Sequence, residues 1–227
     1  MRKVDGSMKV VRETHMSPCP LLEQVTGTRW VGVQFLKHLP ADWECVPREP
    51  LRFCEAVCQA RRGYVDLLPE TIRCEGAKRA FGWTLDEEEG LALHLSEKTG
   101  IDAARARELV RQVPVLADLY AGIRVGNCAD PDVLVTYVRP EAAMRLIRLW
   151  ETATGHSLHA DISSIMAVCG NAVVKAHVSQ SISVSFGCPD SRQYGGIQPE
   201  ELVVAVPTGL LDRFTGIGNT GLPPSAE

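Results

Sequence analysis

The clearest secondary-structure signal in the chain lies between residues 178 and 186. Apolar residues alternate there with serines, and Gln180 is the one break in the alternation. A period of two is typical of a β-strand whose two faces meet different surroundings. The segment therefore predicts an extended strand with a serine face, to which Ser183 and Ser185 belong.

A cysteine lies on each side of this predicted strand. Cys169 comes before it, and Cys188 follows it between Gly187 and Pro189. Glycine and proline end an extended run, so Cys188 is expected on a turn, where a thiol can reach a ligand. The segment from residue 161 to residue 192 thus predicts a site that contains sulfur.

The other hydrophobic patterns alternate between strand-like and helix-like segments. Strands are predicted at 30–36, 64–68, 133–138 and 201–207, and helices at 51–62, 84–100, 102–113, 140–155 and 210–214. Residues 116–128 show no regular period. This mixture predicts an α+β fold, a single compact domain in which helices pack on a mixed or antiparallel sheet. The domain is expected at residues 19–214, after a loose N-terminal arm at 1–18 and before a flexible C-terminal tail at 215–227.

The charge and hydropathy of the chain argue against two classes of binding partner, nucleic acid and membranes. The chain of 227 residues has a formal net charge of -4 and a pI near 5.9, so no broad basic field attracts nucleic acid or an anionic membrane. No apolar run reaches the roughly 18 residues of a membrane-spanning helix, and the first residues lack the apolar core of a secretory signal. We expect a cytoplasmic protein that binds neither nucleic acid nor membrane and that can form a homo-oligomer.

The chain has eight cysteines, more than packing usually requires. Thiols stay reduced in the cytoplasm, so each cysteine fills the core, binds a metal or reacts. Cys54 and Cys58 lie four residues apart on one face of a predicted helix, which suits one metal ion or two core positions. Four cysteines lie at boundaries of the predicted elements: Cys54, Cys74, Cys169 and Cys188. Their spacings match neither a zinc ribbon nor a ferredoxin motif.

Several short motifs resemble those of a known family. They are FCEAV at 53–57, Gly63, Cys74 with Gly76, PDV at 131–133, PEAAMR at 140–145, Cys169, and FGCPDSR at 186–192. Together they resemble the uncharacterised domain-of-unknown-function 169 family, which is found widely in archaea and anaerobic bacteria. The resemblance covers residues 21–211. This family has no settled activity that the chain could inherit.

The resemblance implies a set of four family cysteines. They fall on Cys54, Cys74, Cys169 and Cys188. This chain departs from the family pattern at 75–77, where Glu-Gly-Ala replaces a more glycine-rich segment, and it adds Cys58. Cys58 and Cys128 therefore stay open as alternative ligands. Four thiolates in one interior repel one another unless a cation neutralises them, and zinc or the irons of a cluster favour such a set. The family's abundance in anaerobes favours a [4Fe-4S] cluster over zinc.

Three functions follow as hypotheses. In the first, the four cysteines hold a [4Fe-4S] cluster that exchanges electrons with a redox partner protein or binds a small-molecule substrate, and the serine face donates hydrogen bonds to sulfur. In the second, a metal-free or zinc-structured accessory protein binds a small molecule in a serine-lined pocket, where Ser183 and Ser185 form the wall and Arg192 holds an anionic group. The serines can equally face water. In the third, Cys188 is a nucleophile and His177 is its base.

Overall fold

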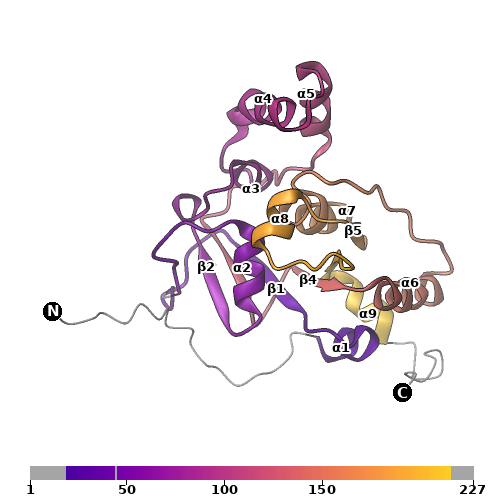
Figure 1. Ribbon diagram of the computed structural model, residues 1–227. Helices are drawn as coiled ribbons and strands as arrows, with labels where there is room; N and C mark the ends of the chain where they lie inside the picture. Colours follow the sequence, from indigo (N-terminus) through magenta and orange to yellow (C-terminus); the bar gives the residue numbers. More distant parts are fainter. Residues whose placement is uncertain (1–18, 44, 216–227) are drawn as a thin grey trace.

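The computed structural model describes residues 19–43 and 45–215. The predicted N-terminal arm at 1–18 lies outside the described residues, and so does the predicted C-terminal tail apart from Thr215. Figure 1 shows helices on both sides of a central sheet, with a pair of helices projecting from this body.

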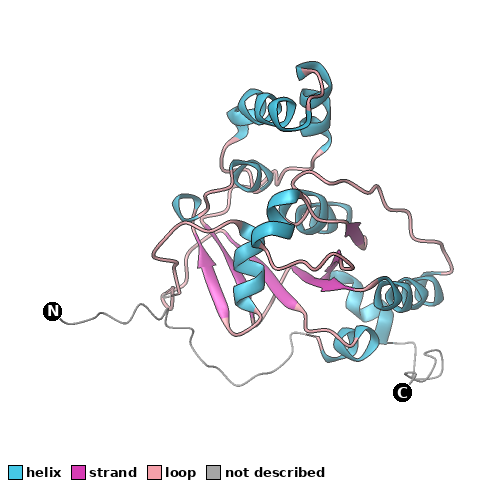
Figure 2. Ribbon diagram, viewed as in Figure 1, coloured by secondary structure: helices cyan, strands magenta, loops and turns pink. Residues whose placement is uncertain are grey.

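A six-stranded sheet forms the centre of the fold (Figure 2). Its strands are β1 (Val31–Leu36), β2 (Tyr64–Leu67), β3 (Gly122–Gly126), β4 (Val133–Val138), β5 (Ser183–Ser185) and β6 (Leu202–Pro207). They lie in the order β2-β3-β1-β4-β6-β5, and neighbouring strands pair antiparallel throughout. This arrangement confirms the predicted α+β class.

Helices surround the sheet along the described part of the chain. The α-helices are α1 (Pro20–Thr26), α2 (Phe53–Ala60), α3 (Glu75–Ala80), α4 (Glu88–Thr99), α5 (Ala103–Gln112), α6 (Pro140–Thr154), α7 (Lys175–Ser179), α8 (Pro189–Tyr194) and α9 (Leu211–Thr215). The shorter turns are the 3-10 segments η1 (Pro69–Thr71), η2 (Leu85–Glu87) and η4 (Thr208–Leu210) and the π-helix η3 (Cys169–Val174). Local chemistry sets their ends. For example, Pro140 begins α6, and Gly155 ends it with a φ of 70°.

Two hydrophobic cores lie on opposite faces of the sheet. Along β4, Val135 and Tyr137 belong to one core, whereas Leu134 and Val138 belong to the other. Successive side chains of a strand point to opposite faces, so a central strand covered on both sides is apolar throughout. The core that contains Tyr137, here called the α2 core, also includes residues of α2, α3 and η3. The other core is covered by α1, α6 and α9.

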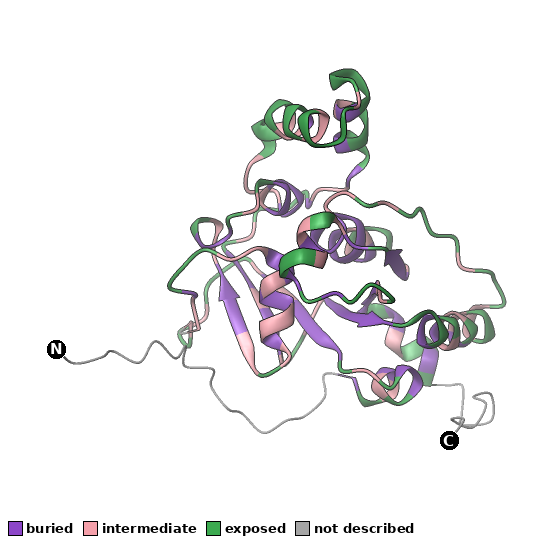
Figure 3. Ribbon diagram, in the orientation of Figure 1, coloured by how far each residue is buried: buried purple, intermediate pink, exposed green. Residues whose placement is uncertain are grey.

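Helices α4 and α5 form a hairpin that projects from the body of the domain (Figure 1). Ala92, Ala106 and Val110 form a small core of its own. Met166 packs against both this small core and the α2 core. Much of the hairpin surface is exposed, in contrast to the buried central strands (Figure 3). Neither these two helices nor any other described helix has the length and apolar character needed to cross a membrane.

The structure shows that the strand predicted at 178–186 is partly wrong. Residues 175–179 form α7 instead, Gln180 takes a left-handed conformation with φ 49°, and β5 covers only Ser183–Ser185. The break in the alternation at Gln180 therefore marks the end of a helix. Ser183 and Ser185 are both buried, so the alternative in which they face water is also wrong.

One strand was not predicted from the sequence. Strand β3 lies within the stretch that shows no regular period, and glycines occupy both of its ends. At Gly126 (φ 134°), a Cβ atom would lie 2.2 Å from the carbonyl oxygen of Gly63. Only glycine fits such a close approach of two backbones, and its lack of a side chain removes the apolar alternation that identifies a strand.

Candidate functional site

Each of the four predicted ligands lies at the beginning of a helical segment. Cys54 is in the first turn of α2, and Cys169 begins the π-helix η3. Cys74 and Cys188 directly precede α3 and α8. The first N–H groups of a helix have no acceptor within the helix, but some of those here have acceptors nearby: Gly170 and Asn171 donate to the carbonyl oxygen of Met166, and Ala77 donates to that of Cys74. The boundary positions expected from the sequence are therefore confirmed.

The four thiols lie close enough to affect one another's ionisation. Burial is the largest cause that raises the pKa of Cys54, and the charges of Cys188 and Cys74 raise it further. Burial also raises the pKa of Cys169 well above its usual value, and Cys74, Cys188 and Cys54 add to the rise. Burial raises the pKa of Cys74 as well; backbone hydrogen bonds oppose this rise, and Cys188 adds to it. The structure thus brings these cysteines together from four separate elements.

The cysteines are neighbours, but their side chains do not form a closed coordination shell. Within residues 19–43 and 45–215, no three His, Cys, Asp or Glu side chains form a group that could hold a metal ion. The chemistry of the donor set nevertheless fits the expected cofactor, because zinc and the irons of a cluster both bind thiolates. A bound cation would also remove the mutual repulsion that contributes to the raised pKa values.

Close backbone contacts surround the thiols. A Cβ atom at Gly195 would lie 2.7 Å from the Cβ and 3.1 Å from the Sγ of Cys54, so only glycine fits there without displacing the cysteine. The buried hydroxyl of Tyr137 donates to the carbonyl oxygen of Cys54 at 3.4 Å. The Gly195 contact packs α2 against the residues after α8, and the Tyr137 hydrogen bond joins α2 to β4.

Cys169 lies in an unusual backbone segment. All six residues of the π-helix η3 are buried, and π-helices are rare and frequently occur at functional sites. Met166, shortly before it, has φ 43°, an uncommon value for a residue other than glycine. Asn171 donates its side-chain N–H to the carbonyl oxygen of Ile165 at 2.7 Å, which fixes the entry to the π-helix.

The remaining cysteines differ in their distance from this group. Cys58 lies one turn after Cys54 in α2. The pKa of Tyr137 is raised mainly by burial, and the charges of Cys54 and Cys58 both add to this rise. Cys58 therefore stays an alternative ligand. Cys128 lies instead beside β1 and β3, where its thiol donates to the carbonyl oxygens of Gly32 (3.7 Å) and Arg124 (3.5 Å). Burial raises the pKa of Cys128 to about 12.

Ser191 fixes the turn on which Cys188 lies, and the sequence analysis missed it. Its Oγ accepts a hydrogen bond from the N–H of Cys188 at 2.8 Å and donates to the carbonyl oxygen of Cys188 at 2.9 Å. The side chain is fully buried. The signal available in the sequence was a serine three residues after Cys188, the spacing over which a side chain reaches back to the residue before a helix.

The predicted serine and arginine donors bind backbone carbonyls. The hydroxyl of Ser185 donates to the carbonyl oxygen of Ala167 at 2.8 Å. The guanidinium of Arg192 donates to four carbonyl oxygens, those of Phe186, Gln198, Pro199 and Glu201. Both side chains therefore hold together loops around Cys188, and an anionic ligand at Arg192 would compete with these bonds.

His177 lies among other partners than Cys188. Its ring packs edge-on against Phe35, with ring centroids 4.9 Å apart, and its Nδ1 has no hydrogen-bond partner. The charge of His177 is one of the smaller causes that act on the pKa values of Asp118 and Asp132, and it lowers both of them. No hydrogen bond joins Cys188 and His177 in the described part of the chain, so the nucleophile and base of the third hypothesis are not paired.

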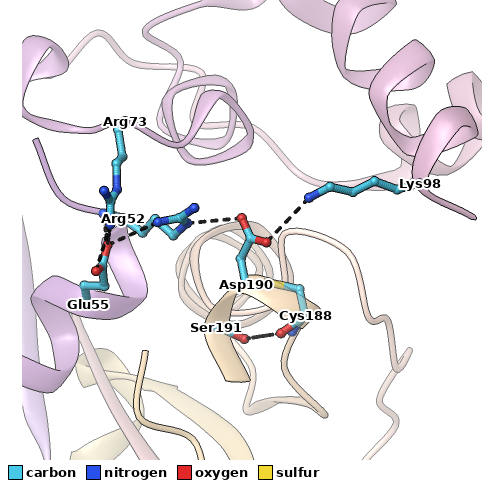
Figure 4. Close-up of polar contacts among 7 residues, drawn as sticks. All are labelled: Arg52, Glu55, Arg73, Lys98, Cys188, Asp190 and Ser191. Atoms are coloured by element: carbon cyan, nitrogen blue, oxygen red, sulfur yellow. Dashed lines mark hydrogen bonds and ion pairs between the residues drawn. The ribbon is translucent and has the colours of Figure 1, made fainter. Parts of the chain in front are cut away.

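A line of five alternating charges, here called the charge chain, lies near Cys188 (Figure 4). Arg73 donates its Nη2 to both carboxylate oxygens of Glu55, at 2.9 and 2.7 Å. Arg52 lies 3.7 Å from Glu55 and donates its Nε to Asp190 at 3.1 Å. Lys98 of α4 lies 3.6 Å from the other oxygen of Asp190. The charge chain thus joins α2 to α8 and to the projecting hairpin.

The fold and the site define an antiparallel α+β protein with four neighbouring cysteines on one face of its sheet. The chain belongs to the DUF169 family, described as uncharacterised ArCR, whose model matches residues 26–215. The Uncharacterized protein MJ0308 of Methanocaldococcus jannaschii is 29% identical over 191 residues, which cover 78% of this chain and 81% of that relative. No solved structure shows a significant similarity. The comparisons confirm the family that the motifs indicated.

Proposed function

We propose that Cys54, Cys74, Cys169 and Cys188 bind one metal centre, and that this centre is a [4Fe-4S] cluster. The observation that carries the proposal is the proximity of these thiols, which come from four elements and lie close enough that the charge of Cys188 contributes to raising the pKa values of Cys54, Cys74 and Cys169. Four thiols gathered from four elements can supply four thiolates to one centre, and these thiolates would repel one another without a cation. A cation or an iron-sulfur core supplies the charge that makes this arrangement favourable.

The chain's own residues would orient and tune the centre. Cysteines ligate as thiolates, so loading the site releases protons that the raised pKa values hold in place. The backbones of Glu55, Ala77 and Gly170 oppose the rise in the pKa values of Cys54, Cys74 and Cys169, and they would stabilise the thiolates of a loaded site. When bound, an iron-sulfur cluster supplies electron transfer or, with one iron open, Lewis-acid activation of a substrate. The corresponding partner is a redox protein or a small molecule.

A second candidate is a zinc-structured or metal-free accessory protein that binds a small molecule. The raised pKa values of Cys54, Cys74 and Cys169 favour its metal-free form, because they keep these thiols protonated and uncharged at neutral pH. A zinc ion would take the same four thiolates at about 2.3 Å. Both candidates require reduced thiols, and we place the protein in the cytoplasm for that reason.

Purification under nitrogen tests the proposal. The expected result is a brown protein with iron, acid-labile sulfide and broad visible absorption. Serine replacements of Cys54, Cys74, Cys169 and Cys188, made one at a time, are each expected to lower the iron content strongly. The matched control is Cys128→Ser, which alters a buried thiol beside other elements and is expected to keep the iron. A colourless protein with one zinc would support the second candidate, and a colourless protein without metal would reject any metal centre.

A further inference from the structure

Met166 lies where the projecting α4 and α5 hairpin meets the body of the domain. Its side chain packs against the small core of the hairpin, here called the hairpin core, and also against the α2 core. Cys169 belongs to the α2 core, and Cys74 packs against it. One half-buried side chain therefore contacts both the hairpin and the core that contains these thiols.

The side chain of Met166 lies against the turn that carries Cys74. A Cβ atom at Gly76 would lie 2.8 Å from the Cγ and 3.2 Å from the Sδ of Met166. The Sγ of Cys74 lies 3.9 Å from the same point. The thioether and the thiol thus flank one glycine, and the absence of a side chain at Gly76 lets Met166 approach the backbone of this turn.

The backbone of Met166 holds the start of the π-helix η3. Its carbonyl oxygen accepts hydrogen bonds from the N–H groups of Gly170 and Asn171, each at 2.9 Å. Its Cβ lies 3.4 Å from the point that a Cβ atom at Gly170 would occupy. Gly170 directly follows Cys169, so Met166 contacts the immediate surroundings of two thiols that lie far apart in the sequence.

The backbone conformation of Met166 is unfavourable for a residue with a side chain. Its φ of 43° lies in the left-handed region, which glycine adopts without strain. Strain of this kind persists only where the surrounding structure holds it, and it is concentrated at functional sites. At Met166, the contacts with the hairpin core, Gly76 and Gly170 offset the strain.

We propose that Met166 is a positioning residue for the thiols of Cys74 and Cys169 and that it couples them to the hairpin. Its backbone holds the start of the π-helix, its side chain holds the Cys74 turn, and the hairpin core holds that side chain in place. The orientation of the hairpin then sets the separation of the two thiols. This positioning belongs to the metal-free protein, whereas its use in regulating a metal centre rests on the proposed function.

Alkylation of the reduced, metal-free protein with iodoacetamide tests the positioning, and peptide mass spectrometry measures the rate at each cysteine. Buried thiols react through local opening, so each rate reports how firmly the surrounding turn is held. Met166→Gly removes the side chain and suits the local φ. It is expected to raise the rates at Cys74 and Cys169 several-fold and to leave the rate at Cys128 unchanged. Met166→Leu keeps an apolar side chain of similar volume and is expected to react like the wild type.

Met144→Gly is the matched control, because Met144 lies half-exposed on α6 in the opposite layer of helices. Glycine within a helix lowers stability in general, so this variant is expected to show no selective rise at Cys74 and Cys169. A rise in Met166→Gly that is equal at Cys74, Cys128 and Cys169, or no rise at all, would overturn the proposal. Equal rates in Met166→Leu and Met166→Gly would also overturn it.

Val110→Ala tests the coupling to the hairpin. Val110 is buried in the hairpin core, so its truncation loosens the surface on which Met166 packs. The variant is expected to raise the rates at Cys74 and Cys169. When it is combined with Met166→Gly, the change in the logarithm of each rate is expected to be smaller than the sum of the two single changes. Additive changes would overturn the coupling. The iron content of the same proteins, purified under nitrogen, is measured separately, so a failure of the metal centre is distinct from a failure of the positioning.

Discussion

Ser191 is the residue that most directly holds Cys188 in position. Replacing it with alanine removes both hydrogen bonds between its Oγ and the backbone of Cys188. We expect Ser191→Ala to lower the free energy of unfolding by about 0.5–2 kcal/mol, the usual cost of losing a capping side chain. Denaturant unfolding measures this change. If Cys188 is a ligand, the variant also loses iron.

A matched control for Ser191 is Ser179. Its hydroxyl donates to the carbonyl oxygen of Lys175, but the residue is exposed at the end of α7. We expect Ser179→Ala to change stability by no more than about 0.5 kcal/mol. Equal effects of the two replacements would show that the turn before α8 does not depend on the Ser191 side chain.

Asp132 links stability to pH at the other end of the sheet. Burial raises the pKa of this carboxyl above its usual value of 3.8, although the N–H of Phe35 donates to it and the charge of His177 lowers it. The folded state therefore holds a proton more tightly than the unfolded state, so this group costs stability as the pH rises above 3.8. Asp132→Asn keeps an oxygen acceptor for Phe35. The variant is expected to gain stability over the wild type as the pH rises from 4 to 6, measured by thermal unfolding.

Asp118 provides the opposite case for comparison. The hydrogen bond and charge of Lys37 lower the pKa of Asp118 below its usual value of 3.8. Its contribution is therefore stabilising above that value and is lost as the pH falls. Asp118→Asn is expected to be less stable than the wild type above pH 3.8, and this difference is expected to shrink as the pH falls below 3.8. A difference between Asp118→Asn and the wild type that does not change as the pH falls below 3.8, or parallel curves for Asp132→Asn and the wild type between pH 4 and 6, would contradict the respective assignment.

The site residues that could be predicted from the sequence were those that belong to family motifs. The four cysteines were identified from the motifs, and the structure brings them together. The charge chain could not be predicted, because Arg52, Lys98 and Asp190 meet only through the packing of α2, α4 and α8. Sequence separation carries no information on such pairs. Ser191 was missed because it reaches back to a cysteine, which is not a usual capping partner.

The α4 and α5 hairpin is expected to be dispensable for folding of the sheet. Its two helices pack mainly on each other, and its links to the body include Met166 and the pair of Lys98 with Asp190. We expect replacement of residues 86–112 by a short Gly-Ser linker to leave the sheet folded. Far-UV circular dichroism is expected to show the loss of two helices, with a decrease of only a few degrees in Tm.

A control for the hairpin deletion disturbs the opposite layer of helices. Leu146 of α6 is buried against the sheet, so Leu146→Asp places a charge in an apolar core without a partner. This variant is expected to lose several kcal/mol or to unfold. Unfolding of the hairpin deletion under conditions in which the wild type is native would show that α4 and α5 are part of the main folding unit.

The success of element prediction followed the strength of the local pattern. The buried strand β4 was predicted because it is a short, continuous run rich in β-branched residues, and the long helix α6 was predicted because its apolar residues repeat with a period of 3.6. Strand β3 was missed because close contacts at Gly126 require glycine. The end of α7, residues 178 and 179, was predicted as part of a strand because the alternation of apolar residues with serine is too short there to distinguish the two periods.

At the scale of the molecule, the sheet separates two hydrophobic cores that differ in their cysteine content. The core under α1, α6 and α9 contains apolar side chains and the single cysteine Cys19. The α2 core contains Cys54 and Cys169, with Cys74 packed against it. The α+β class could be predicted from the mixture of local patterns, but the strand order β2-β3-β1-β4-β6-β5 could not. That order depends on pairings between distant strands, which also decide that the cysteines share one face.

The metal-free protein is expected to be folded at neutral pH and to lose stability at alkaline pH. Cys54, Cys74 and Cys169 have pKa values raised above 9.0, so only the unfolded state releases their protons as the pH passes 9.0. Each such thiol lowers stability by up to about 1.4 kcal/mol per pH unit. Denaturant unfolding of chelated, reduced protein between pH 8 and 10 is expected to show a steeper decline for the wild type than for Cys169→Ala. Equal slopes would mean that Cys169 ionises as readily in the folded protein as in the unfolded chain, which would contradict its burial beside the other thiols.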